Sequence, residues 1–272
     1  MDNSTGLLLG KHTPVVEAYS PELLYPIPRV NARATLGISD TPPFFGVDLW
    51  HAYELSWLDN SGKPVVRVGR FTVPAMTPNI VESKSFKLYL NSLNSTRFDS
   101  VEAAQRCMES DISDAAGGKV TLELFLLDDP ALVGLGVEGL LIDNLGILQL
   151  QGKPDATQLL VEPDIIREEQ LYSHLLRSLC PVTGQPDWAT LWIHYKGVAL
   201  DHQALLGYII SYREHQEFHE QCVERIFLDI NSRAQPEFLH IQAFYTRRGG
   251  LDINPFRTTN PSAMPLPRLN RQ

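Results

Sequence analysis

The feature that most constrains the fold is a series of predicted elements that occurs twice along the chain. In the first half, residues 49–58 and 64–73 carry aromatic and β-branched side chains, which are typical of β-strands. The turn-forming segment 59–62 between them predicts a hairpin. Two amphipathic helices follow, and residues 119–127 again have the composition of a strand.

The second half predicts the same series. Two strands, two helices and a final strand are predicted over residues 169–179, 189–196, 202–212, 217–232 and 237–246. A hairpin, two helices and a strand, occurring twice, indicate a duplicated α+β unit of roughly 120 residues. We therefore expect two domains, over residues 1–150 and 151–272.

The helices of the first half carry specific signals. The apolar face of the first helix is predicted to contain Phe86, Leu90 and Leu93. Asp99 and Glu102 have the spacing of a capping box, which would begin the second helix, and the pair Gly117-Gly118 would end it. The first forty or so residues are rich in Pro, Ser, Thr and Asn, and predict an extended arm wrapped over the N-terminal domain.

Charge and composition narrow the functions open to the chain. The 272 residues are 43% hydrophobic and 20% charged, as in a globular protein with a core. The formal net charge of −9 would repel a nucleic acid, so we expect a small-molecule substrate and no direct contact with tRNA or DNA. We expect no secretory signal and no membrane helix. Three cysteines without framework spacing indicate a reduced, cytoplasmic protein.

Residues 134–139 (GLGVEG) match the G-x-G-x-x-G dinucleotide fingerprint, but their surroundings do not fit it. The fingerprint needs a strand that runs directly into a helix, so that pyrophosphate meets the helix N-terminus. Here Asp128-Asp129-Pro130 interrupts the chain after the preceding strand, and a short apolar segment follows. We interpret the match as a glycine-rich connection.

Cys180 and Asp187 stand at the two ends of the hairpin connection predicted in the second half. A turn at Thr183-Gly184 would fold Asp187 back toward Cys180. A thiol beside an acid suits covalent addition followed by proton delivery. A buried, inert cysteine beside a turn aspartate explains the same residues equally well, so the pattern alone leaves both interpretations open.

Residues 218–222 (FHEQC) predict the first turn of a helix. The helix dipole favours Glu220 there, and His219 would face the core, so helix-start chemistry alone accounts for both. Cysteine and histidine also raise the question of a metal site. Cys180, His219 and Cys222 lack the spacing of zinc ligands, and we expect no metal.

Two further segments have the composition of phosphate-binding sites. Residues 81–87 would place Ser83 and Lys84 at the start of a helix, where anions bind. Arg247-Arg248 precedes Gly249-Gly250, where backbone N–H groups can approach a phosphate closely. Each segment also has an ordinary explanation, as a serine-capped helix with solvated charges and as a charged strand end with a turn.

Four segments considered together carry a family resemblance. They are ESKSFKLY at 82–89, LCPVTGQPDW at 179–188, FHEQC at 218–222 and RRGGLDINP at 247–255. With them the chain resembles, over nearly its whole length, the 7-cyano-7-deazaguanine reductases in their long, two-module form, the nitrile reductases of queuosine biosynthesis. The resemblance implies tandem tunnelling-fold modules, in which antiparallel sheets with helices on one face assemble into a barrel, and a homodimer.

The resemblance also implies roles for individual residues. Cys180 would attack the nitrile carbon to give a covalent thioimide, and Asp187 would donate the proton. The residues that would hold the deazaguanine are Val81, Glu82, Ser83, His219 and Glu220. The residues that would bind NADPH are Ser83, Lys84, Arg248 and Gly249. Two NADPH molecules would be consumed in turn, because a nitrile needs two hydrides to become an amine.

Two alternatives belong to other classes of protein. One is a zinc-dependent cyclohydrolase of the same fold, acting on a purine-like or pterin-like ring; it would require a metal site. The other is a non-catalytic purine-binding module, against which the retention of both Cys180 and Asp187 argues.

Overall fold

The computed structural model describes residues 18–39, 41–148 and 152–272, which fall into two compact units. The described part of unit 1 contains residues 18–39, 48–133 and 247–252. The described part of unit 2 contains all the others. Both units are therefore built from segments that lie far apart in the sequence.

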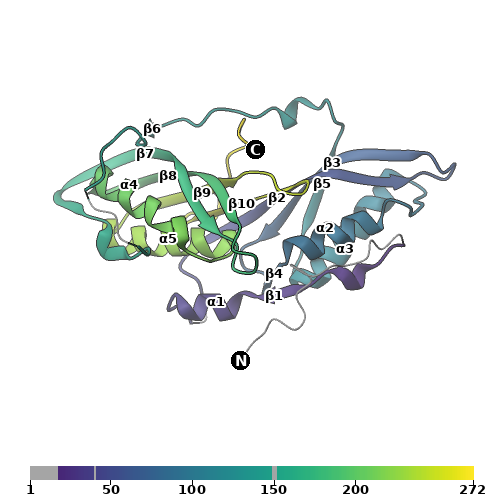
Figure 1. The fold of residues 1–272 in the computed structure, drawn as a ribbon, viewed down its shortest axis with the longest axis horizontal. Coiled ribbons are helices and arrows are strands. Elements are labelled where there is room, and N and C mark those ends of the chain that lie inside the picture. Colours follow the sequence, from purple (N-terminus) through teal and green to yellow (C-terminus); the bar gives the residue numbers. More distant parts are fainter. Residues whose placement is uncertain (1–17, 40, 149–151) are drawn as a thin grey trace. The chain divides into compact units, whose positions relative to one another are not determined.

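Unit 1 contains three adjacent hydrogen-bonded strands of the larger sheet and a two-stranded sheet. Its elements are η2 (Pro21–Leu23), β1 (Pro26–Pro28), α1 (Arg29–Thr35), β2 (Phe45–Leu58, from residue 48 onward), β3 (Pro64–Pro74), β4 (Asn79–Val81), α2 (Ser83–Ser92), α3 (Val101–Ala116), β5 (Thr121–Phe125) and η3 (Pro130–Leu132) (Figure 1). The larger sheet has the order β5–β3–β2, and β1 pairs antiparallel with β4.

Helix α2 covers the sheet of unit 1 through one aromatic side chain. Phe86 packs against Trp50 and Phe71, with ring centroids 4.9 and 5.1 Å apart. All three rings are buried, and truncating a buried aromatic to alanine typically costs about 3–5 kcal/mol. The predicted apolar face of this helix, with Phe86, Leu90 and Leu93, is thus confirmed.

Helix α3 corrects the predicted capping box. Its N-cap is Ser100, whose hydroxyl accepts from the Ala103 N–H over 3.1 Å, and not Asp99. The reason is local: the serine hydroxyl already satisfies one of the open N–H groups of the first turn. Gly117, with φ of 73°, ends the helix in the left-handed conformation, as predicted.

The predicted extended arm is wrong for residues 29–35, which form helix α1. The proline-rich segment ends at Pro28, which stands at the N-cap, so no ring blocks the helix that follows. The helix is held by buried arginines: Arg29 forms an ion pair of 2.6 Å with Asp48, and Arg33 donates to the Ala75 carbonyl over 2.7 Å. Residues 1–17 of the arm lie outside the described residues.

Unit 2 is built on a larger sheet. Its elements are β6 (Leu140–Leu141), η4 (Ala156–Gln158), β7 (Val161–Leu179), β8 (Pro186–Leu200), α4 (His202–Ile210), η5 (Ser211–Glu214), α5 (His219–Ala234), β9 (Phe238–Tyr245) and β10 (Leu251–Thr258, from residue 253 onward) (Figure 1). The strand order is β10–β9–β8–β7–β6, antiparallel except for β6, which runs parallel to β7.

The two faces of this sheet are buried by different partners. Leu191, Ile193 and Tyr195 of β8 are at most 1% exposed and share one face of the strand, against which α5 packs. On the other face Trp192 and Phe244 form a cluster with Phe256 and Leu269. Burial on both sides explains why β8 is rich in hydrophobic residues without simple alternation.

Hairpin, two helices and strand occur in this order in both units, as the sequence predicts. Strands β7 and β8 are longer than predicted, and their pairing contains two register shifts, after Glu162 and after Ser173. Strand β10 was not predicted at all. In the described chain after residue 139, β6 and turns follow the G-x-G-x-x-G segment instead of a helix, which confirms the glycine-rich connection.

Candidate functional site

Cys180 is the first residue after β7 and begins the turn that leads into β8. The Cys180 N–H donates to the Gln185 carbonyl, and the Gly184 N–H donates to the Cys180 carbonyl, each over 2.9 Å. Gly184 has φ of 67°, a left-handed conformation that suits glycine. The two hydrogen bonds hold the backbone of Cys180 in place. The residue is 7% exposed, so most of it is shielded from solvent.

Asp187 lies on the same face of the hairpin as Cys180. Ser178 of β7 is directly opposite Asp187 of β8, and Leu179 is opposite Pro186. The hydrogen bond from the Cys180 N–H to the Gln185 carbonyl continues this pairing one step past the end of β7, so the alternation of side chains puts Cys180 on the face of Ser178 and Asp187. Asp187 is 6% exposed. The structure therefore places Cys180 and Asp187, both buried, at the two ends of one short turn.

His219 joins this face from helix α5, of which it is the first residue. Its Nε2 lies 3.3 Å from the Asp187 carboxylate, and its ring stacks on Tyr245 with centroids 3.7 Å apart and planes 12° from parallel. Its Nδ1 is buried and has no hydrogen-bond partner among the described residues. The side chain is thus held from one face and one edge.

Glu220 follows His219 and is 3% exposed. A carboxylate in the first turn of a helix lies in the favourable field of the helix dipole. Cys222, one turn further, is fully buried, and burial raises the pKa of its thiol, with the charge of Glu217 acting in the same direction. Of the two buried cysteines, Cys180 belongs to the hairpin itself, whereas Cys222 contacts Ser178 and Tyr245 from helix α5.

Glu82, predicted to hold the deazaguanine, is the N-cap of α2 in unit 1. Its Oε1 accepts from the Lys84 N–H over 3.0 Å and its Oε2 from the Ser85 N–H over 2.7 Å. The helix is therefore capped by glutamate and not by serine. Burial raises the pKa of this carboxyl, while the two backbone hydrogen bonds oppose the rise. Since a carboxylate offers about four acceptor sites, each oxygen can still accept from a ligand.

The neighbours of Glu82 are positioned by the same helix start. Val81 is buried at the end of β4, paired with Pro26 of β1. Ser83 and Lys84 are the first two residues of α2 and are partly exposed. Unit 1 thus places the predicted base-binding Glu82 directly beside the predicted phosphate-binding residues.

Arg248 and Gly249 lie in a tight hairpin turn between β9 and β10. Arg248 and Leu251 exchange backbone hydrogen bonds of 2.9 and 3.1 Å, and Gly249 and Gly250 have φ of 58° and 80°. Two successive positive φ values are the requirement of a type I′ turn, which explains the glycine pair. The turn belongs to unit 1.

Lys87 of α2 lies against this turn and was missed by the sequence analysis. A Cβ added to Gly249 would lie 3.1 Å from Lys87 Nζ, and the same nitrogen is 3.5 Å from Glu54 Oε2. Lys84 and Lys87 are three residues apart and share one face of α2. That spacing is the signal in the sequence that could have found Lys87.

The base of the same turn is fixed by buried polar contacts. The Asp252 carboxylate accepts from the Tyr53 hydroxyl over 2.6 Å and contacts His51 Nδ1 over 2.7 Å. The Arg247 guanidinium lies over the Tyr53 ring, 3.7 Å from its centroid, a favourable cation–π distance. Arg247 is thereby tied to the sheet of unit 1.

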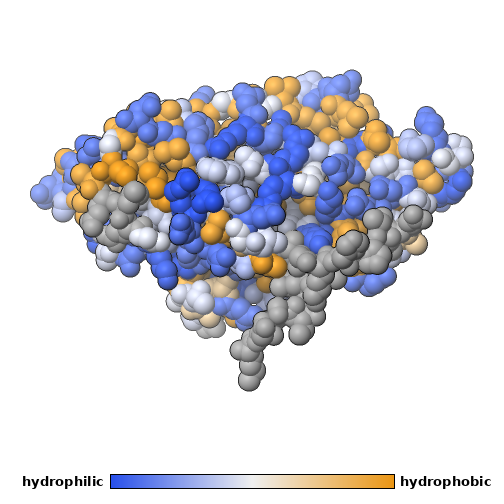
Figure 2. All heavy atoms as spheres, in the orientation of Figure 1, coloured by the Kyte–Doolittle hydropathy of each residue, from blue (hydrophilic) through white to orange (hydrophobic). Residues whose placement is uncertain are grey.

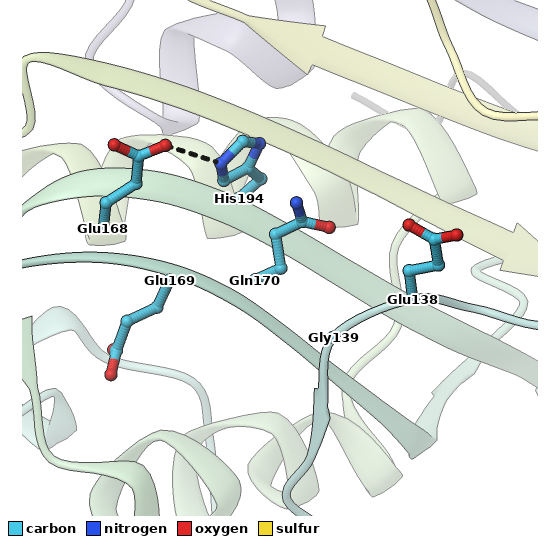
Figure 3. Close-up of a pocket in the computed structure, with 6 residues that line it drawn as sticks. All are labelled: Glu138, Gly139, Glu168, Glu169, Gln170 and His194. Carbon is cyan, nitrogen blue, oxygen red and sulfur yellow. Dashed lines mark ion pairs between the residues drawn. The ribbon is translucent and has the colours of Figure 1, made fainter.

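A pocket of about 460 Å³ in unit 2 lies elsewhere, lined by Glu138, Gly139, Glu168, Glu169, Gln170 and His194. Figure 3 shows Glu168 and His194 turned toward each other, with an ion pair of 3.5 Å, while Glu169 points away. Glu169 is held by the Tyr195 hydroxyl over 2.9 Å and by His202 Nε2 over 3.1 Å. Since no thiol and none of the predicted site residues line this pocket, it is not the candidate site.

The described residues contain neither a candidate metal site nor a candidate membrane helix. No group of three or more His, Cys, Asp or Glu side chains among them could hold a metal ion, and all three cysteines are free thiols. Within residues 18–39, 41–148 and 152–272, no helix has the length and apolar composition needed to span a bilayer.

The surface carries apolar as well as charged regions. Figure 2 shows hydrophobic side chains gathered over the part of unit 2 that contains α4 and β7. The exposed large hydrophobic residues of this unit include Leu140, Leu145, Ile147, Leu160 and Ile166. A gathered apolar patch of this kind is typical of a protein contact surface.

The site as a whole defines a class of protein. A shielded thiol, a carboxylic acid and an imidazole on one hairpin face are the groups of covalent thiol catalysis.

The comparisons with known proteins then give the family. Residues 15–124 match the family described as nitrile reductase, 7-cyano-7-deazaguanine-reductase N-term, and residues 186–263 match the family QueF-like protein.

Two relatives match over 97% of this chain. The NADPH-dependent 7-cyano-7-deazaguanine reductase of Dechloromonas aromatica (strain RCB) is 54% identical over 94% of its own length. The protein of the same name from Chromohalobacter salexigens is 51% identical over 96% of its length. The chain belongs to the family of 7-cyano-7-deazaguanine reductases, and the resemblance of its sequence segments is confirmed.

Proposed function

We propose that this chain reduces the nitrile of 7-cyano-7-deazaguanine to a primary aminomethyl group with NADPH, through a covalent thioimide on Cys180. The observation that carries the proposal is the turn with Cys180 at its start and Asp187 at its end, 3.3 Å from His219, in a member of this reductase family. The product would serve queuosine biosynthesis, as the resemblance implies. A formal net charge of −9 favours the free base over tRNA as the substrate.

Cys180 would form the first bond. Its sulfur adds to the nitrile carbon, and one of the carbon–nitrogen π bonds becomes a lone pair on nitrogen. A thioimide accepts hydride more readily than a nitrile, so the addition divides a difficult reduction into easier steps. The low exposure of Cys180 supports this role, because water is kept from the adduct.

Asp187 would take up the proton that the Cys180 thiol loses and would donate it to the nitrile nitrogen as sulfur adds. Its place opposite Ser178, at the end of the turn that begins with Cys180, supports this role. His219, at 3.3 Å, holds the carboxyl group in place. General acid catalysis of this kind contributes roughly 10²–10⁴ in rate.

Glu82 and Glu220 would bind the pyrimidine edge of the deazaguanine. That edge presents N–H donors, and a carboxylate can accept two of them at once. Both carboxylates are buried, at 1% and 3% exposure, where an unpaired donor on the ligand would be costly. Val81, Ser83 and His219 would complete the contacts with the ring.

The residues of unit 1 fit an NADPH phosphate. Lys84, Lys87 and Arg248 supply positive charge, and Gly249 leaves open the space that a Cβ would fill beside Lys87. Ser83 would add a hydroxyl donor at the helix start. Two NADPH molecules, bound one after the other, would each supply one of the two hydrides that take the nitrile to the amine.

We further propose that the chain consists of tandem tunnelling-fold modules, over residues 1–150 and 151–272, and that it is a cytoplasmic homodimer. The repeated order of elements supports the modules, and the exposed apolar residues of unit 2 support association. Sedimentation equilibrium tests the dimer: a mass of one chain would contradict it.

The function is tested by following NADPH absorbance with 7-cyano-7-deazaguanine as the sole added substrate. In a second experiment without NADPH, the intact protein should gain the mass of one nitrile molecule per chain, and peptide mapping should place it on Cys180. Cys107→Ala is the matched control, because Cys107 lies on α3 in unit 1. No NADPH oxidation, or an adduct on Cys222, would contradict the proposal; turnover dependent on added zinc would favour a cyclohydrolase.

A further inference from the structure

Tyr245 is a buried tyrosine next to the proposed catalytic face that the mechanism above does not use. It is the last residue of β9 and 1% exposed. It lies directly opposite Ala189, which is two residues after Asp187 on β8. By strand alternation, the Tyr245 side chain therefore shares the face of Asp187 and Cys180.

The ring of Tyr245 stacks on the His219 ring at a shorter centroid distance than most aromatic pairs have. Their centroids are 3.7 Å apart and their planes 12° from parallel, whereas aromatic pairs commonly lie about 4.5–7 Å apart. His219 begins a helix, where no preceding helical turn limits its side chain. The stack fixes the plane of the imidazole, and that plane decides whether Nε2 meets the Asp187 carboxylate at 3.3 Å.

The hydroxyl group of Tyr245 has no comparable function. It is buried, lies near Ser178 and Cys222, and has no hydrogen-bond partner of good geometry among the described residues. Burial raises the pKa of the phenol, so the group stays neutral beside the carboxylate. The part of Tyr245 that acts on His219 is the face of its ring.

We propose that Tyr245 is a positioning residue that holds the His219 imidazole in the orientation in which it contacts Asp187 and the substrate. The inference rests on the proposed function for its kinetic readout. The aromatic ring, and not the hydroxyl, would carry this role. Loss of the ring would therefore lower kcat/KM for the nitrile and leave the KM for NADPH unchanged, because the proposed NADPH contacts are in unit 1.

Tyr245→Leu and Tyr245→Phe separate ring from hydroxyl. We expect Tyr245→Phe to keep kcat/KM for the nitrile within about twofold, and Tyr245→Leu to lower it at least tenfold, because small misplacements of a positioned group can cost about a hundredfold. The KM for NADPH should not change. Phe238→Leu is the matched control: its ring lies 5.2 Å from His240, another stacked pair on β9, and its kinetics should equal wild type.

A double-mutant cycle tests that Tyr245 acts through His219. In the His219→Ala background, Tyr245→Leu should cause little further loss, since the group that it positions is gone. Equal losses in both backgrounds would overturn the proposal, as would wild-type kinetics of Tyr245→Leu or a Tyr245→Phe enzyme as impaired as Tyr245→Leu. If Tyr245→Leu does not fold, Tyr245→Met replaces it.

A spectroscopic measurement makes the test independent of turnover. With ring-labelled histidine, the His219 signal, assigned by its loss in His219→Ala, should be shifted upfield by the tyrosine ring current. The shift should persist in Tyr245→Phe and disappear in Tyr245→Leu. An unshifted signal in folded wild type would overturn the stack itself. A wild-type enzyme that is inactive but shows the shift would contradict the proposed function and leave the stack intact.

Discussion

The hairpin turn of unit 1 and that of unit 2 occupy the same place in the repeated series of elements but are built from different chemistry. In unit 1 the turn is organised by Asp59, whose carboxylate accepts from Ser61 N–H over 2.9 Å and Lys63 N–H over 3.0 Å, open to solvent. In unit 2 the turn encloses Cys180 at 7% exposure. The Asp59 carboxylate accepts hydrogen bonds from N–H groups of its own turn, whereas Asp187 lies just after the turn on a buried face.

Two carboxylates near helix starts, the buried Glu82 and the half-buried Glu217, differ in the same way. Burial raises the pKa of Glu82, whose partners are two neutral N–H groups. Burial also acts on Glu217, but hydrogen bonds from His215 and Arg225 outweigh it and lower the pKa. Neutral donors thus leave a buried carboxyl easy to protonate, whereas cationic partners keep it ionised. The proposed base-binding Glu82 belongs to the first kind.

The comparison of the two turns predicts the largest effect. Asp187→Asn removes the proposed proton donor and should lower kcat by roughly 10²–10⁴. Asp59→Asn changes the corresponding turn of unit 1, where asparagine is a good turn residue, and should leave kcat unchanged. Steady-state kinetics with saturating NADPH measure both. Equal activity of the two variants would show that the chemistry does not depend on the turn of unit 2.

The separation of phosphate contacts from nitrile contacts predicts the next effect. Arg248→Ala should raise the KM for NADPH about ten- to a hundredfold, since a charged hydrogen bond contributes about 1.5–3 kcal/mol, and should leave that for the nitrile nearly unchanged. Arg106→Ala, on the exposed side of α3, is the control. If only the KM for the nitrile increased, the assignment of the Gly249 turn to NADPH binding would be wrong.

The two proposed base-binding carboxylates should differ in what their loss does. Glu220→Leu should weaken nitrile binding by about 2 kcal/mol, roughly thirtyfold, and Glu220→Gln less. Glu82→Leu should weaken binding and also lower the free energy of unfolding by about 0.5–2 kcal/mol, because it removes the N-cap of α2. Calorimetric titration and urea unfolding separate the two quantities. Wild-type affinity in both leucine variants would contradict the pocket.

The smallest predicted effect is a pair of opposite pH dependences. The pKa of Glu217 is lowered on folding, so its stabilisation is present above about pH 4.5 and is lost as the pH falls through the folded pKa. The pKa of Glu82 is raised, so its contribution is full below about pH 4.5 and is lost as the pH rises through the folded pKa.

Glutamine variants reveal these slopes. On acidification below about pH 4.5, Glu217→Gln should lose its stability deficit relative to wild type. On raising the pH above that value, Glu82→Gln should gain relative to wild type, in each case by about 1.4 kcal/mol per unit of pKa shift. Urea midpoints at several pH values measure both. Slopes of the same sign would contradict the contrast between neutral and cationic partners.

Periodicity predicted much of the fold and less of the site. The alternation in 49–58 and the apolar spacing around Phe86 report burial directly, so these elements were found. Strand β10 was not, because all of its residues are buried and LDINPFRT lacks alternation and contains a proline. Helix α1 was not predicted, because prolines precede it. Its buried face also contains arginines, which a sequence pattern predicts to be exposed.

Only contacts between residues that are close in the sequence could be predicted for the site. Cys180 and Asp187 were paired because a turn of a few residues joins them. The contact between His219 and Tyr245 depends on how α5 lies against β9, and that between Lys87 and Gly249 on segments over 160 residues apart in the chain. Such contacts follow from tertiary packing, which a single sequence does not specify locally.

The assignment of residues 247–252 to unit 1 bears on the order of events during synthesis. His51 and Tyr53 are made early, yet their carboxylate partner Asp252 emerges about 120 residues after the rest of unit 1 has ended at residue 133. At 5–20 residues per second this is a delay of roughly 6–24 s. Through that interval His51 lacks its native partner, so unit 1 reaches its native state only when the ribosome has nearly finished the chain.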